Sequence, residues 1–163
     1  MRILGIDPGS RRTGWGVVQL EGTRLVHIGS GTIAVSEKLP LEKRLRSIHG
    51  ALEQVIGEHQ PGAVAVEEIF FAKYANAALK LGHARGVALL VAAQAELELH
   101  EYPPAIVKRT VVGRGAADKV QIGRLVTALL GLKAPPEEDA ADALAVAITH
   151  IQASRSGALG RKR

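Results

Sequence analysis

Aspartate is scarce in this sequence and occurs where the chain is otherwise most apolar. It is found only at Asp7, Asp118, Asp139 and Asp142, whereas glutamate is used freely on the predicted helices. Asp139 and Asp142 lie three residues apart among alanine, leucine, valine and isoleucine, which places both carboxylates on one side of a helix suited to burial. Two like charges in apolar surroundings call for a cation, and oxygen ligands favour a hard ion such as Mg²⁺ or Mn²⁺.

Further carboxylates follow apolar runs that are typical of buried strands. Asp7 ends the run from Arg2 to Ile6, and Glu67 and Glu68 follow the run from Ala63 to Val66. Successive residues of a strand face opposite sides of the sheet, so at most one of the two glutamates can join a site on a given face. The residues alone do not choose between them. Acids at strand ends, together with the helical pair, predict one metal site at an edge of the sheet.

Each acidic feature also has a purely structural explanation. Asp139 could cap its helix while Asp142 meets an arginine or solvent, and Asp7 could serve its Asp-Pro-Gly turn. Taken singly, these explanations compete well with a functional role. The metal site is favoured because several acids converge on the same edge.

The segments that must position these acids alternate between strands and helices. An opening antiparallel meander followed by alternating elements predicts an α/β fold with a mixed sheet and helices packed on its faces. The expected strands cover residues 2–6, 14–20, 25–35, 63–66 and 99–102. One helix is expected from residue 41 until Pro61-Gly62 ends it, and one or two helices over about 75–97. A short helix follows Pro103-Pro104 and ends near residue 111, another covers about 119–130, and the last begins after Pro135-Pro136.

Composition limits the class of protein. The 163 residues, 47% of them hydrophobic, suffice for one core, so residues 1–153 are expected to form one domain and residues 154–163 a basic, disordered tail. The net charge of +5 favours a polyanionic partner. Cysteine is absent, which excludes disulfides, zinc–thiolate sites and thiol nucleophiles. With no segment that resembles a signal peptide or a membrane span, we expect a soluble, cytoplasmic protein.

Five ordered motifs extend over most of the sequence. They are Gly5-Ile6-Asp7-Pro8-Gly9-Ser10, Thr13-Gly14-Trp15-Gly16, Ala65-Val66-Glu67-Glu68 leading into Phe70-Phe71-Ala72-Lys73, Val107-Lys108-Arg109-Thr110-Val111-Val112-Gly113, and Asp139-Ala140-Ala141-Asp142-Ala143-Leu144-Ala145 with Ile148-Thr149-His150. Together these motifs resemble the RuvC family of Holliday junction resolvases. The likeness runs from about Arg2 to His150, and five motifs in order are far more specific than any one alone.

The resemblance implies a ribonuclease-H-like fold, a mixed sheet flanked by helices on both faces. It implies a Mg²⁺-dependent endonuclease that resolves four-way DNA junctions by paired, symmetric nicks in two strands of like polarity. Two Mg²⁺ ions per active site, replaceable by Mn²⁺, would give 5′-phosphate and 3′-hydroxyl ends. The implied partners are a second copy of the chain, in a homodimer, and the branch-migration proteins RuvA and RuvB.

The resemblance also assigns roles to residues. It aligns Asp7, Glu67, Asp139 and Asp142 with the catalytic, metal-binding acids, and this alignment is what selects Glu67 over Glu68. At the third of these four positions some family members have a histidine, whereas this sequence has an aspartate, Asp139. Lys119 is the candidate catalytic cation near the scissile phosphate. The expected DNA contacts are Phe70, Lys73, Lys80, Lys108, Arg109, Arg114 and Lys119.

Other functions are weighed against this one. An Asp-x-Gly turn followed by Thr-Gly also opens the phosphate loop of actin-like and sugar-kinase-like ATP-binding proteins, but the chain has no room for their second domain. A non-catalytic junction-binding module would not require the intact acids. A related nuclease family, thought to process ribosomal RNA precursors, would leave the segment from Val107 to Gly113 unexplained. The small, apolar stretch from Ala75 through Ala93 fits either a dimer surface or a buried core helix.

Overall fold

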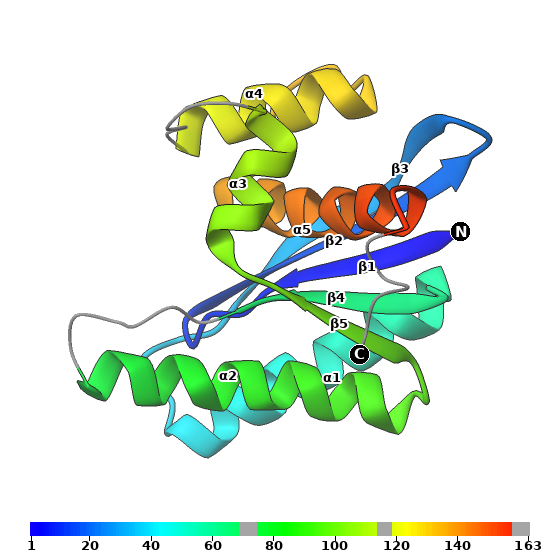
Figure 1. Ribbon diagram of the computed structural model, residues 1–163. Helices are drawn as coiled ribbons and strands as arrows, with labels where there is room; N and C mark the ends of the chain where they lie inside the picture. The colour runs from blue at the N-terminus through cyan, green and yellow to red at the C-terminus, as the bar shows by residue number, and fades with distance from the viewer. Residues whose placement is uncertain (69–74, 114–118, 158–163) are drawn as a thin grey trace.

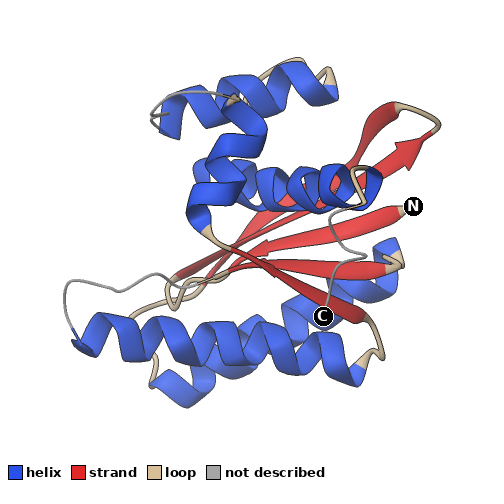
Figure 2. Ribbon diagram, viewed as in Figure 1, coloured by secondary structure: helices blue, strands red, loops and turns tan. Residues whose placement is uncertain are grey.

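The computed structural model describes residues 1–68, 75–113 and 119–157 as a five-stranded sheet covered by helices on both faces (Figures 1 and 2). Two helices, α1 and α2, cover one face, and α3, α4 and α5 lie over the other. The strands are β1 (Arg2–Asp7), β2 (Arg12–Glu21), β3 (Arg24–Ala34), β4 (Ala63–Glu67) and β5 (Glu98–Tyr102). The helices are α1 (Leu41–His59), α2 (Ala75–Gln94), α3 (Pro104–Val112), α4 (Lys119–Leu130) and α5 (Glu138–Arg155).

The strand order is β3-β2-β1-β4-β5, with β1, β2 and β3 antiparallel and β1, β4 and β5 parallel. The predicted meander and the α/β class are therefore confirmed. In the central parallel pair, Ile6 lies beside Val66, so Asp7 and Glu67 both stand one residue beyond that pair. The register brings two of the predicted acids to the same edge of the sheet.

Helix α5 is the centre of the core on its face of the sheet. Every residue from Ala140 to Ile151 is buried except Asp142, which is half-buried. An apolar helix of this kind gains most of its stability from packing and little from intrinsic propensity. Asp142 is thus the one residue in this buried run that is partly exposed.

Glycines in β1 and β2 allow α5 to lie directly on the sheet. A Cβ atom added at Gly14 would overlap the carbonyl oxygen of Asp139, and one added at Gly5 would overlap that of Ala143. Because Gly5 and Gly14 have no side chains, the backbone of α5, which carries two predicted acids, can pack directly against β1 and β2. The motifs that contain Gly5 and Gly14 do not by themselves indicate this packing role.

We expect Gly14→Ala to destabilise the protein and to displace the first turn of α5. Overpacking of this kind costs about 1–3 kcal/mol, because the helix must shift to admit the methyl group. Urea unfolding followed by circular dichroism measures the loss. Gly50→Ala is the matched control, because Gly50 lies on an exposed position of α1 where an added Cβ meets nothing within 4 Å. That control should gain about 0.5–1 kcal/mol, and a Gly14→Ala protein as stable as the control would refute the packing argument.

The element boundaries agree with the sequence apart from local differences. The stretch from Ala75 forms a single helix that ends at Gln94, and β2 begins two residues earlier than expected, at Arg12. Helix α5 continues to Arg155, past the expected domain boundary at residue 153, and residues 158–163 of the expected tail lie outside the described residues. In the described segments, no helix combines the length and apolar character that crossing a membrane requires.

Candidate active site

Three of the four predicted acids line one cavity at the edge of the sheet. Asp7 comes from the end of β1, Glu67 from the end of β4 and Asp142 from the second turn of α5. All three side chains are half-buried. The cavity has a volume of about 230 Å³ and is lined by Asp7, Glu67, Pro104, Val107, Lys108, Ile122 and Asp142.

Lys108 brings a positive charge to the same cavity. It lies on α3, which begins directly after β5 with prolines at positions 103 and 104, and its side chain is exposed. Proline suits the first turn of a helix because its missing N–H has no partner there in any case. The cavity therefore combines three carboxylates, whose oxygens can hold a hard cation, with one lysine, whose charge can attract a phosphate.

The fourth acid, Asp139, is engaged elsewhere. The guanidinium Nε of Arg12 donates to Oδ2 of Asp139 at 2.6 Å, and its Nη2 donates to Oε2 of Glu137 at 2.9 Å. The hydrogen bond and charge of Asp139, with a further contribution from Glu137, raise the pKa of Arg12. Asp139 is not among the described residues that line the cavity. The structural explanation of the acidic pair expected an arginine partner for Asp142, and the structure has one at Asp139.

Asp7, Glu67 and Asp142 line the same cavity, but their carboxylates do not surround a single point at metal-binding distance. In the parts of the chain that the structure describes, no three acidic or histidine side chains are close enough to enclose a metal ion. Glu68, the alternative to Glu67, is not a described lining residue of the cavity, and its backbone N–H donates to the carbonyl of Tyr102 at 2.9 Å. The geometry thus favours Glu67, which the strand pattern alone could not select.

The remaining candidates are only partly described. Lys80 on α2 and Arg109 on α3 are exposed, as a phosphate contact requires. Lys119 is the first residue of α4, and its side chain lies outside the described part of the structure. Phe70, Lys73 and Arg114 also lie outside the described residues.

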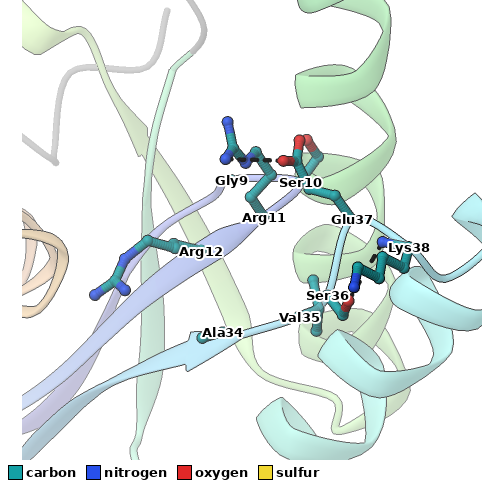
Figure 3. Close-up of a pocket in the computed structure, with 9 residues that line it drawn as sticks. All are labelled: Gly9, Ser10, Arg11, Arg12, Ala34, Val35, Ser36, Glu37 and Lys38. Carbon is teal, nitrogen blue, oxygen red and sulfur yellow. Dashed lines mark hydrogen bonds and ion pairs between the residues drawn. The ribbon is translucent and has the colours of Figure 1, made fainter.

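A larger cavity, of about 710 Å³, adjoins the turn that follows Asp7 (Figure 3). Arg11 reaches Glu37 across it at 2.9 Å, while Arg12 points away from that pair. Its lining residues are Gly9, Ser10, Arg11, Arg12, Ala34, Val35, Ser36, Glu37 and Lys38. This hollow contains none of the four predicted acids, so its size does not make it the better candidate for the chemistry.

Two supporting residues were not found from the sequence. Arg44 is spaced by helical turns from Ile48 and Leu52, so it lies on the buried side of α1, and it donates to the carbonyl of Ser10, in the turn after Asp7. Thr13 is buried as well, and its Oγ1 donates to the carbonyl of Gly9 at 2.8 Å. Both bonds fix the turn that carries the chain from Asp7 to Arg12. Arg44 bonds to a residue that is distant in sequence, and Thr13 bonds within an irregular turn, so no periodic pattern in the sequence could reveal these two bonds.

His150 belongs to the core. Its Nδ1 is 2.9 Å from the hydroxyl of Tyr102, and its ring stacks at a tilt on His100 with centroids 4.3 Å apart. Burial, reinforced by the neighbouring His100, lowers the pKa of His150 to about 4. The motif residue is thus a neutral packing partner between α5 and β5.

Comparison with known proteins identifies the family. Residues 3–150 match the family described as crossover junction endodeoxyribonuclease RuvC. The chain belongs to the RuvC family. A RuvC from Sorangium cellulosum is 54% identical over 154 residues, which cover 94% of this chain and 86% of that protein. A second, from Afipia carboxidovorans, is 53% identical over 162 residues, covering 99% of this chain and 95% of the relative.

The fold agrees with this membership. The structure of Thermus thermophilus RuvC in complex with a Holliday junction substrate superposes with a TM-score of 0.87 at 35% identity, covering 96% of this chain and 97% of that one. The RuvC family consists of metal-dependent nucleases with a ribonuclease-H-like fold, so both the predicted fold class and the predicted enzyme class are confirmed. The family match covers the segment that the actin-like or sugar-kinase-like alternative would assign to an ATP-binding domain, and it favours the nuclease.

Proposed function

We propose that this chain resolves four-way DNA junctions by paired, symmetric nicks in two strands of like polarity. The observation that carries the proposal is the shared cavity of Asp7, Glu67 and Asp142 with Lys108, in a chain of the RuvC family. A non-catalytic junction-binding module would have no use for three carboxylates from β1, β4 and α5 in one space. The products would carry 5′-phosphate and 3′-hydroxyl ends.

Asp7, Glu67, Asp139 and Asp142 are proposed as ligands of two Mg²⁺ ions, for which Mn²⁺ can substitute. The donor set fits, because carboxylate oxygens are the ligands that these hard ions prefer. Three of these acids already line the cavity, and the fourth lies in the preceding turn of α5. When bound, the ions would supply an activated water and stabilise the leaving oxygen of an in-line displacement.

The chain's own cations would hold the phosphate and balance its charge. Lys108 lines the cavity, and Lys119 is proposed as the catalytic lysine on the strength of its place in the family motif. Lys80 and Arg109 present exposed charges suited to backbone phosphates. The remaining proposed DNA contacts, outside the described residues, are Phe70, Lys73 and Arg114.

A homodimer is proposed because resolution needs two coordinated cuts and each chain supplies one site. The exposed side of α2 offers a surface for it. Leu79 and Leu90 are 63% and 51% exposed, and they share one helix face with Gly82 and Gly86. A Cβ added at either glycine would meet nothing within 4 Å. Glycine inside a helix costs stability, and no described part of the chain packs against these two glycines. Close approach of a second copy of the chain would explain why glycine occupies both positions.

Further proposals rest on family membership and on the bacterial relatives. RuvA and RuvB are proposed as partners, and a DNA substrate in a bacterial cell supports a cytoplasmic location. We propose residues 1–153 as the nuclease domain, with the last two residues of α5 extending past that boundary, and the basic segment that ends at residue 163 as an appendage to it.

A competition assay tests the proposed substrate. An unlabelled four-way junction should displace a labelled one at least about tenfold better than linear duplex at equal nucleotide concentration, because a two-fold dimer engages both halves of the junction. Raising salt from about 50 to 200 mM should weaken binding at least about 100-fold, since phosphate contacts release counterions. Equal competition by linear duplex would reject a structure-specific enzyme in favour of a general nuclease.

A further inference from the structure

Arg12 ties together the two acids that flank the start of α5. The guanidinium of Arg12 contacts Asp139 at 2.6 Å and Glu137 at 2.9 Å, one nitrogen to each carboxylate. These partners are distant in sequence from Arg12, which is the first residue of β2. The contact therefore joins the sheet to the helix terminus that carries the proposed metal ligands.

The backbone around this contact is fixed from both sides. Two residues beyond Arg12, Gly14 lies against the carbonyl of Asp139 so closely that no side chain fits between them. On the other side, the buried hydroxyl of Thr13 bonds to Gly9 and closes the turn from β1. Arg12 is thereby held opposite Asp139 by packing, and its position does not depend on the ion pair alone.

The Asp139 side chain is 26% exposed and is not among the described lining residues of the cavity shared by Asp7, Glu67 and Asp142. We propose that Arg12 is a positioning residue that holds the Asp139 carboxylate at the rim of the active site, so that a divalent cation must compete with Arg12 for it. The inference rests on the proposed function, because it takes Asp139 to be a metal ligand. Arg12 would then lower the affinity of the site for the divalent cation, although it is not itself one of the metal-binding acids.

Arg11 provides a matched comparison within the same turn. It has the same charge and is adjacent in sequence, yet it pairs with Glu37 across the larger cavity and points away from Arg12 (Figure 3). Loss of either arginine removes one positive charge near the site. Only loss of Arg12 releases the Asp139 carboxylate.

The test is Mn²⁺ binding to the full chain without DNA, measured by isothermal titration calorimetry. Arg12→Gln should lower the dissociation constant by about two- to fivefold, the range expected from removing one partly exposed ion pair. Arg11→Gln should change it by less than about 1.5-fold, because solvent and salt screen an exposed charge that does not contact a ligand. Circular dichroism should show both variants folded, since both pairs lie at the surface.

A double-mutant cycle separates competition from general electrostatics. In an Asp139→Asn background, Arg12→Gln should no longer tighten Mn²⁺ binding beyond the Arg11→Gln control. Equal effects of the two arginine variants, or a gain that persists in Asp139→Asn, would overturn the positioning role while leaving the proposed metal site intact. If the unmodified chain binds no Mn²⁺, the proposed metal site fails and this inference fails with it.

Discussion

A chain carrying Asp142→Asn should bind a four-way junction and fail to cut it. Loss of outer partners of metal ligands typically costs about 10–100-fold, so loss of a direct ligand should reduce the nicking rate by more than about 100-fold. Binding should persist or strengthen, because removing a negative charge cannot weaken attraction to phosphate. The measurement is nick mapping on a synthetic junction with Mg²⁺, beside a gel-shift assay without the metal. The same result is expected for single amide replacements at Asp7, Glu67 and Asp139.

Glu68→Gln is the matched control for this series. It removes the same charge one residue from Glu67, at a side chain that is not among the described residues of the cavity. Its nicking rate should stay close to that of the unmodified chain. Strong cleavage by Asp142→Asn, or an inactive Glu68→Gln beside an active Glu67→Gln, would contradict the assignment of the acids.

Charges placed on the exposed side of α2 should convert paired nicks into single ones. In a Leu79→Glu/Leu90→Glu chain, the proposed interface would bring like charges together from both copies, and the dimer should dissociate. A monomer carries one site, so it would nick one strand and release the junction before the second cut. A plasmid with an extruded cruciform reports this directly, because paired nicks give linear DNA and single nicks give open circles.

The control places the same charge elsewhere on α2. Ala77 is exposed and lies about half a turn away from the Leu79 face, so Ala77→Glu should leave both the dimer and the linear product unchanged. Sedimentation velocity at micromolar concentration measures the assembly state of each chain. A Leu79→Glu/Leu90→Glu protein that sediments as a monomer and still yields linear product would refute the link between dimer and paired cleavage.

The elements of this fold were predictable because their signals are local. The apolar positions Leu45, Ile48, Leu52 and Val55 repeat at helical spacing, and α1 forms over them. The apolar run from Ala63 reads as a buried strand, and β4 is buried at all four apolar positions. Short-range patterns of this kind determine which segments become helix or strand.

The arrangement of the site was less predictable because it depends on contacts between distant segments. Strand alternation left Glu67 and Glu68 equivalent, and a choice needed either the family motif or the cavity. The spacing of Asp139 and Asp142 correctly placed them on one helix, yet it could not reveal that Arg12 engages the first of them. Nor could a local pattern reveal that Arg44 donates to Ser10, because the two residues are 34 positions apart in the chain.

The central place of α5 has a consequence for when activity can arise during synthesis. Asp7 lies on the first strand and Asp142 on the last helix, with the Glu67 strand between them in the chain. A nascent polypeptide that has released only the sheet and α1 to α4 from the ribosome would hold two of the cavity's three acids. Contacts of such long sequence separation form late and slowly. A chain whose last helix has not docked therefore lacks one of the three cavity acids, and we expect it to be inactive as a nuclease.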